Sequence, residues 1–518
     1  MQILWRIQQT PNFAGKGSQY FTKKTNNDRR RDKALNIRAT LAVWSRLLVL
    51  TNRKKHNNVA PPKQTPDRTL SESSSGGVVP SLGPRPPALP VEVWRRILAF
   101  VTRFPGANAI DREDPFASQY EPPESLQADA ELLEDRKRLL MVCRTWRPIV
   151  FEIMSEYMVI CCDQHLLVIV ERLEKSKTTL GGNGLGEWTR RIDFQMNKGK
   201  CAGWLTTATP DIVVRLLRCT PNLAIYINNN ISHVPEFETS SKIIHALVTY
   251  CGKSLRRVEW NCAGERPSWS HLQSISHNVP NLQTLRIACM PPYPPPPGCS
   301  AHIPSTRLKT LSLGLVPRPA HSILNFPPSW DPLLSWLATS KNHLPALEVL
   351  EATILPDIDF FRKHGHKIRC LRVMSWSTPS NFPTILHLCP NLRNLTLSLK
   401  RIDVLHLPPN HPSLQRICVL PFNEDFIRVP SWLFASAVLA PLDMLLMKIE
   451  EMDLPQLVQV RIRNVGVFAD VVDHPVWLQL WWRRWNIRRV RFEDKSGRTF
   501  QSVCPGASLL LGEWHSTI

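Results

Sequence analysis

Three short motifs bring together residue types that can do chemistry. "CGKS" at 251–254 resembles the end of a phosphate-binding loop, "GGNGLG" at 181–186 has the glycines of a dinucleotide-binding turn, and "HGH" at 364–366 has two imidazoles for a metal. The phosphate loop requires a glycine five residues before Gly252, where this chain has Leu247. The glycine-rich stretch does not follow a strand, and the histidines fit a turn. The sequence therefore predicts no catalytic residue, no cofactor and no metal site.

The stretch "VWLQLWWRRWNIRRVRF" near the C-terminus allows two interpretations. Trp477, Trp481 and Trp485 fall on one face of a predicted helix, and arginines are interleaved among them. Aromatic rings among arginines can bind single-stranded nucleic acid by stacking and charge. A terminal helix that buries its tryptophans, with arginines extending outward, has the same pattern. Burial is the favoured interpretation, and a nucleic-acid-binding scaffold using this segment and the N-terminal tail is the alternative.

The charge of the chain is strongly basic and unevenly distributed. The 518 residues carry a net charge of +21, and residues 1–80 hold 15 Lys and Arg against 4 Asp and Glu. The composition of residues 1–85 predicts a disordered basic tail and linker. This tail has the features of a transit peptide, of a nuclear signal, and of an appended segment or a start placed too far upstream.

The cysteine pattern and the hydropathy favour a cytoplasmic or nuclear location. The 13 cysteines include no C-x-x-C pair, so zinc spacing is absent and reduced thiols are expected. The N-terminus lacks the apolar core of a secretory signal, and no apolar run reaches 18 residues. We therefore expect no membrane contact.

A repeated pattern extends from about residue 188 to the end of the chain. Its core is an apolar residue, two others, an apolar residue, one other and an apolar residue, as in "LQTLRI" and "LRNLTL". Eight copies begin at Leu255, Leu282, Leu308, Leu347, Ile368, Leu392, Leu414 and Leu457. Several copies follow a helical segment that ends in Pro-Asn, which predicts helix, turn and short strand in each unit. Stacked units of this kind form a parallel α/β solenoid.

A small helical unit is predicted before the repeats. "LPVEVWRRIL" begins at Leu89 and has apolar residues at helical spacing, and "LLMVCRTWRPIV" begins at Leu139. An insertion separates the two halves, and its residues 111–135 carry nine Asp and Glu and the single base Arg112.

The two halves of this unit resemble the F-box, in which a Leu-Pro start leads a short helix and a Val-Cys-x-x-Trp helix closes the unit. The whole chain is similar to fungal F-box proteins with irregular leucine-rich repeats. The resemblance implies a surface that docks the Skp-type adaptor of SCF ubiquitin ligases, and through it a cullin. The matching positions are Leu89, Pro90, Ile97, Leu98, Leu140, Val142, Cys143 and Trp146. The acidic insertion departs from the family, where a short turn joins the halves.

The resemblance implies an α/β protein of three parts. These are a disordered basic tail at 1–85, an F-box-like helical domain at 86–160, and an irregular leucine-rich-repeat solenoid at 161–518. The expected function is that of a non-enzymatic receptor whose repeats hold a target protein for ubiquitin transfer by partner subunits. A simple helical cap on the solenoid is the structural alternative for the F-box-like domain.

The predicted strands also point to a surface for the target. Side chains alternate along a strand, so the residues beside the central apolar position of each motif face away from the core. On a curved solenoid they line the concave face, where arginines recur. The candidate target-binding residues are Arg257, Glu259, Arg286, Arg372, Arg416 and Arg461. Because Arg pairs with carboxylate and phosphate, this face predicts an acidic or phosphorylated target.

Overall fold

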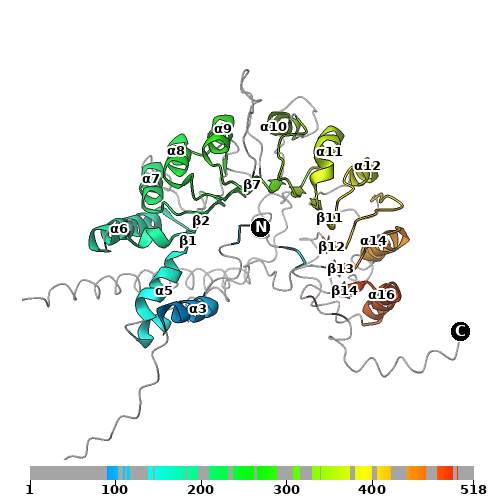
Figure 1. The fold of residues 1–518 in the computed structure, drawn as a ribbon, viewed down its shortest axis with the longest axis horizontal. Coiled ribbons are helices and arrows are strands. Elements are labelled where there is room, and N and C mark those ends of the chain that lie inside the picture. Colours follow the sequence, from blue (N-terminus) through cyan, green and yellow to red (C-terminus); the bar gives the residue numbers. More distant parts are fainter. Residues whose placement is uncertain are drawn as a thin grey trace, which may run out of the picture.

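The chain forms an arch of parallel strands with helices on its outer side (Figure 1). The computed structural model describes residues 90–102, 109–110, 114–116, 138–143, 146–180, 182, 184–195, 209–230, 237–261, 265–288, 307–314, 330–338, 340–373, 380–399, 405–421, 440–462, 475–493, 497 and 499. Predictions that fall on residues 1–85, including the basic tail, lie outside this part of the chain.

Each strand of the main sheet pairs in parallel with the strands next to it in sequence. The order matches the chain order, apart from the two short strands β4 (Phe237–Glu238) and β6 (Glu265–Arg266), which pair with each other. The main sheet contains β1 (Tyr157–Ile160), β2 (Arg191–Phe194), β3 (Ile225–Asn228), β5 (Arg257–Trp260), β7 (Thr284–Ile287), β8 (Thr310–Leu313), β9 (Val349–Ala352), β10 (Cys370–Val373), β11 (Asn394–Leu399), β12 (Arg416–Pro421), β13 (Gln459–Ile462) and β14 (Arg491–Glu493). This open sheet is compatible with a solenoid.

Helices connect most of the strands and cover the convex side of the sheet (Figure 1). They are α6 (Asp163–Leu180), α7 (Thr209–Cys219), α8 (Ser241–Cys251), α9 (Trp269–Asn278), α10 (Asp331–Leu337), α11 (Ile358–His364), α12 (Phe382–His387), α14 (Ala440–Glu451) and α16 (Pro475–Ile487), with 3-10 turns η1 (Gly184–Trp188) and η2 (Gly365–Lys367). None of the helices in the described ranges is long and apolar enough to cross a membrane.

One continuous apolar core lies between the sheet and these helices. In β5, for example, Val258 and Trp260 are fully buried in this core, whereas the alternating Arg257 and Glu259 face the inside of the arch. The apolar residue that opens each of the eight motifs is buried two residues before its strand, as Leu255 is before β5. The predicted strand positions are therefore confirmed for all eight copies.

The last strand, β14, was not among the predicted repeats. Phe492 lies opposite Val460, the central apolar residue of the β13 motif, so Arg489 stands where the other copies have their opening apolar residue. Val490 and Phe492 are buried, but Ile487 is exposed at the end of α16. The sequence has no copy of the apolar motif in the register that β14 adopts, which is why the repeat pattern did not predict this strand.

A second, smaller core lies in the helical unit at the N-terminal end of the arch. It joins α3 (Val91–Thr102), the helical residues 138–142 and α5 (Trp146–Ser155). Its buried members are Leu98, Leu140, Ile149, Val150, Ile153 and Met154. Pro148 lies within the first turn of α5, where proline is tolerated.

The buried side chain of His364 should make the stability of the arch depend on pH. His364, from the "HGH" motif, is fully buried, and its Nε2 lies 3.0 Å from the Ala338 carbonyl oxygen while its Nδ1 lies 3.2 Å from Lys367 Nζ. The ammonium donates to Nδ1, so the imidazole must be neutral and donates from Nε2. Burial lowers the pKa of His364 to about 4, and Lys367 adds to this, against the raising effect of the Ala338 hydrogen bond.

We expect the free energy of unfolding to fall as the pH drops from 6.5 to about 4. Over this window the unfolded chain binds a proton at His364 and the folded chain does not, which destabilises the fold by at most about 3 kcal/mol. Urea denaturation at pH 7 and pH 4.5 measures the loss. The variant His364→Gln keeps an N–H donor but does not titrate, so a loss as large as that of the unmodified chain would contradict this assignment.

Candidate interaction surfaces

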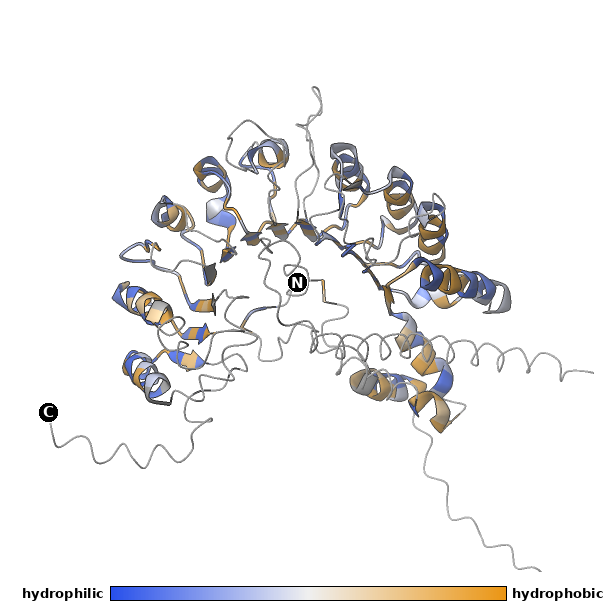
Figure 2. Ribbon diagram, turned by 180° about the vertical axis from the view of Figure 1, so that it is seen from behind, coloured by the Kyte–Doolittle hydropathy of each residue, from blue (hydrophilic) through white to orange (hydrophobic). Residues whose placement is uncertain are grey.

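The helical unit exposes a group of apolar side chains. Val93, Ile97 and Phe100 lie on one face of α3 at helical spacing, and Phe100 is 91% exposed. We define the helical apolar surface as the exposed side chains Val91, Val93, Ile97, Phe100, Met141 and Val142. In Figure 2 both helices of this unit carry extensive hydrophobic colouring. Exposed apolar groups that gather around one small core mark a surface for binding another molecule.

Contacts between the helices hold this surface in place. Arg95 of α3 donates from Nε and Nη2 to Oε2 of Glu152 in α5, at 3.2 and 2.9 Å. The Trp94 and Trp146 rings pack against each other with their centroids 4.9 Å apart. The backbone of α3, which carries Val91, Val93, Ile97 and Phe100 of this surface, is therefore held against α5.

The structure divides the eight predicted adaptor-contact residues into four groups. Pro90, Ile97, Val142 and Cys143 are exposed, and Trp146 is half-buried. Leu98 and Leu140 are each only 1% exposed, so the expectation that they offer apolar area to a partner is corrected. They fill the unit's own core because the inner face of α3 packs directly on α5. Leu89 lies outside the described residues.

The inner face of the arch carries a series of polar side chains, which we call the concave polar surface. It consists of Arg257, Glu259, Arg286, Glu351, Arg372, Arg416 and Arg461. The predicted orientation is right, because their apolar neighbours in each strand belong to the core on the other side. The expected exposure is wrong for most of them, since Arg257, Glu259, Arg286, Arg372 and Arg461 are between 1% and 9% exposed.

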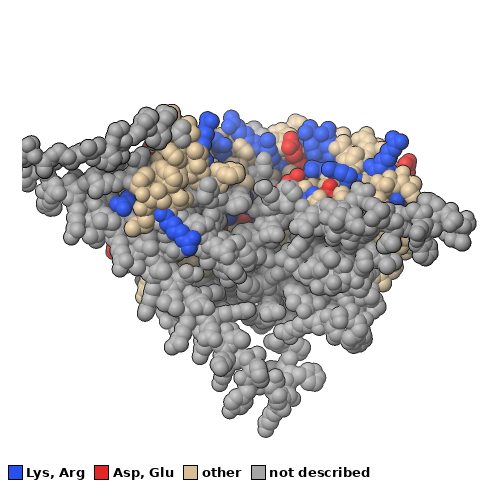
Figure 3. Space-filling view, turned by 90° about the horizontal axis from the view of Figure 1, so that it is seen from below, with Lys and Arg blue, Asp and Glu red and all other residues tan. Residues whose placement is uncertain are grey.

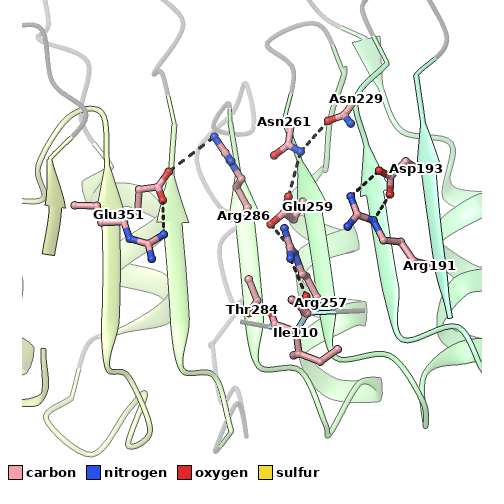
Figure 4. Close-up of polar contacts among 12 residues, drawn as sticks. Ile110, Arg191, Asp193, Asn229, Arg257, Glu259, Asn261, Thr284, Arg286 and Glu351 are labelled. Atoms are coloured by element: carbon pink, nitrogen blue, oxygen red, sulfur yellow. Dashed lines mark hydrogen bonds and ion pairs between the residues drawn. The ribbon is translucent and has the colours of Figure 1, made fainter. Parts of the chain in front are cut away.

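Ion pairs between these side chains explain why the arginines tolerate burial. Arg257 Nε donates to Glu259 Oε1 at 2.9 Å (Figure 4). Glu351 lies between two arginines, 3.9 Å from Nη2 of Arg286 and 3.5 Å from Nη1 of Arg372. Buried charges require such partners. Carboxylates on the sheet itself thus compensate arginines that the sequence pattern suggested were free for a target.

Carboxylates on the sheet also pair with buried arginines near both ends of the sheet. Arg461 donates to Glu493 of β14, which also accepts from Gln459 at 2.6 Å. Near the other end, Arg191 donates to both carboxylate oxygens of Asp193, at 2.8 and 2.7 Å. Burial is the largest single influence on the pKa of Arg191 and would lower it, but the hydrogen bonds to Asp193 together with the attraction of nearby acidic groups raise it above the usual value.

Arg416 on β12 differs from the other arginines of the concave polar surface. Its side chain is 32% exposed, whereas those of Arg257, Arg286, Arg372 and Arg461 are between 4% and 10% exposed. Its Nε donates to the amide oxygen of Asn394 at 2.7 Å. Its charged partner is Asp114, from the acidic insertion, with Nη1 and Oδ2 3.4 Å apart.

A second part of the insertion also contacts the concave side. Arg257 Nη1 donates to the Ala109 carbonyl oxygen at 2.9 Å, and Thr284 Oγ1 donates to the Ile110 carbonyl oxygen at 3.0 Å. Figure 1 shows these short described stretches, in blue, inside the arch. Sequence reasoning missed this placement, although the opposite charges of the insertion and of the strands were visible.

Two of the three tryptophans singled out in the C-terminal segment are buried and Trp477 is partly buried, which agrees with the favoured interpretation. Trp481 and Trp485 of α16 are fully buried against the core, and Asp443 of α14 accepts hydrogen bonds from Trp477 and Trp481. Arg484 pairs with Glu450 rather than extending freely. These rings are not available for stacking on nucleic-acid bases.

The surface of the described residues has mixed charge. Figure 3 shows Lys and Arg side chains with Asp and Glu between them along one edge. A polar depression of about 500 Å³ lies where β9 to β13 begin, and its lining includes Glu348, Arg369 and Arg393. Arg369 and Glu348 lie 3.8 Å apart within it. Within the described ranges, no group of three or more His, Cys, Asp or Glu residues is placed to hold a metal ion.

No family model matches the chain, and no curated protein is significantly similar to it.

Proposed function

We propose that the chain is the substrate-recruiting subunit of an SCF-type, cullin-RING ubiquitin ligase. Its helical unit docks a Skp-type adaptor, and its arch, a solenoid of irregular leucine-rich repeats, binds the target protein. The observation that carries the proposal is the helical apolar surface, which contains two of the F-box-like positions, Ile97 and Val142. The chain supplies no catalytic group in this role, because partner subunits transfer the ubiquitin.

The connection between the helical unit and the arch supports this role. Only Glu156 separates α5 from β1, and its carbonyl oxygen accepts from the backbone N–H groups of Arg190 and Arg191 at 2.9 Å each. The Arg95 guanidinium also lies 5.9 Å from the centre of the Trp188 ring. A short, hydrogen-bonded junction of this kind would hold a target on the arch at a fixed orientation relative to the adaptor.

The nucleic-acid-binding alternative uses the N-terminal tail and the tryptophans of α16. The burial of Trp481 and Trp485 gives the second part no support, and the tail lies outside the described residues. Binding of nucleic acid by the chain, with an affinity that falls steeply as the salt concentration rises, would support this alternative.

We expect the purified chain, a Skp-type adaptor and a cullin to elute together in size-exclusion chromatography with light scattering, at the mass of a one-to-one-to-one complex. The cullin should join the chain only when the adaptor is present, because the adaptor bridges the two. Separate elution of the chain from an adaptor–cullin complex would contradict the proposed function.

A further inference from the structure

The acidic insertion contributes a three-residue element that Arg416 recognises twice. Its guanidinium lies 3.4 Å from the Asp114 carboxylate and over the Phe116 ring, 4.6 Å from the ring centre. The Phe116 backbone N–H donates to Asp114 Oδ1 at 3.0 Å, which places the carboxylate and the ring on the same short turn. Phe116 is only 6% exposed although it belongs to no helix or strand. One arginine therefore binds a carboxylate and an aromatic ring from a segment about 300 residues away in sequence.

The contacts at Ala109 and Ile110 are of a different kind. Both use backbone carbonyl oxygens, which accept from Arg257 and Thr284. Contacts to the main chain fix the position of a segment without selecting its side chains. Among the contacts of the described insertion residues, those that depend on a side chain of the insertion are the ones of Asp114 and Phe116 with Arg416.

Arg416 is also the arginine best suited to exchange its partner. Arg257, Arg286, Arg372 and Arg461 each have a carboxylate on the sheet, whereas the carboxylate at Arg416 comes from outside it. Asp114 is half exposed, with 49% of its side chain accessible. Exposed ion pairs of this kind are weak, so an external ligand of the same chemistry can compete.

We propose that Arg416 is the recognition residue for an acidic peptide in which an aromatic residue follows an aspartate by two positions, and that Asp114–Phe116 occupies this site in the free chain. The target must displace the chain's own segment before it binds. This inference rests on the proposed function, since it names the class of target that the receptor takes.

The test measures binding of a fluorescent peptide with the sequence of residues 109–117, AIDREDPFA, by anisotropy. A tethered segment competes at an effective concentration on the order of millimolar, so it fills most of the site when its intrinsic dissociation constant lies well below that concentration, as the proposal requires. The full-length variant Asp114→Asn/Phe116→Ala should bind the peptide at least about tenfold more tightly than the unmodified chain. Adding Arg416→Gln to this variant should abolish the gain, whereas adding Arg369→Gln, at an exposed arginine with a similar carboxylate neighbour, should not.

The variant Asp114→Asn alone keeps the buried Phe116 ring and so controls for misfolding caused by its loss. Its affinity for the peptide should also rise, by a smaller factor. Equal peptide affinity for the unmodified chain and for both variants would overturn the proposal, as would a gain that survives Arg416→Gln. The assay contains no adaptor. A failed peptide assay with intact adaptor binding therefore rejects only this inference, and the reverse result rejects only the proposed function.

Discussion

Replacing Ile97 and Val142 with aspartate is expected to reduce the affinity for a Skp-type adaptor by at least about 100-fold. Burying an aliphatic side chain of this size contributes about 1.5–3 kcal/mol, and each factor of ten in affinity corresponds to about 1.4 kcal/mol. Both side chains are exposed in the free chain, at 41% and 58%, so the substitutions should leave the unfolding transition unchanged. Binding of immobilised adaptor, followed by surface plasmon resonance, gives the affinity, and thermal denaturation checks the fold.

The matched control is Ile487→Asp, which makes the same chemical change at the exposed end of α16, where 83% of the side chain is accessible. It should bind the adaptor as the unmodified chain does. A double variant that retains full affinity would show that the helical apolar surface does not dock the adaptor.

Replacing Glu351 with glutamine is expected to lower the free energy of unfolding by about 3 kcal/mol, the low end of the range for breaking a buried ion pair. Glutamine keeps the size of the side chain but leaves the buried guanidinium groups of Arg286 and Arg372 without the charge that lies 3.9 and 3.5 Å from them. Urea denaturation followed by far-ultraviolet circular dichroism measures the loss.

The neighbouring residue Glu348 provides the control for this prediction. It lies 3.8 Å from Arg369, but their side chains are 44% and 55% exposed. Ion pairs of this kind contribute about 0–1 kcal/mol, so Glu348→Gln should have little effect. Equal losses from the two variants would mean that Glu351 does not neutralise the concave arginines.

The burial of Glu351 also changes how target binding on this face must be tested. Replacing both Arg286 and Arg372 with glutamate would surround Glu351 with two further buried carboxylates. Such a variant would be destabilised, so a loss of target binding could result from unfolding rather than from loss of the binding residues. Arg416 is the arginine at which a substitution can separate the two effects.

The sequence was sufficient to place the strands of the eight predicted repeats but not to describe the surface they form. Each of these strands begins two residues after the apolar residue that opens its motif, because the motif follows from which side chains are buried beneath the helices. The alternation of side chains along each strand correctly predicted that Arg286 and Arg372 face the inside of the arch. It contained no information about their partner, because Glu351 lies in another repeat.

The remaining errors have the same physical origin. Leu98 and Leu140 were expected to face a partner, and they instead face each other's helices across a core that forms between distant segments. The contact of Asp114 with Arg416 joins residues about 300 positions apart, and no local pattern encodes it. The opposite charges of the acidic insertion and the strand arginines suggested that they attract each other, but only the fold shows which of these residues are in contact.

Titration calorimetry of a purified Skp-type adaptor into the full-length chain tests the central claim most directly. The account predicts saturable one-to-one binding with a dissociation constant of about 1 μM or tighter, as for an interface of standard size. It also predicts a negative heat-capacity change, because the helical apolar surface becomes buried. Absence of binding at adaptor concentrations of about 100 μM, with the chain folded, would contradict the account.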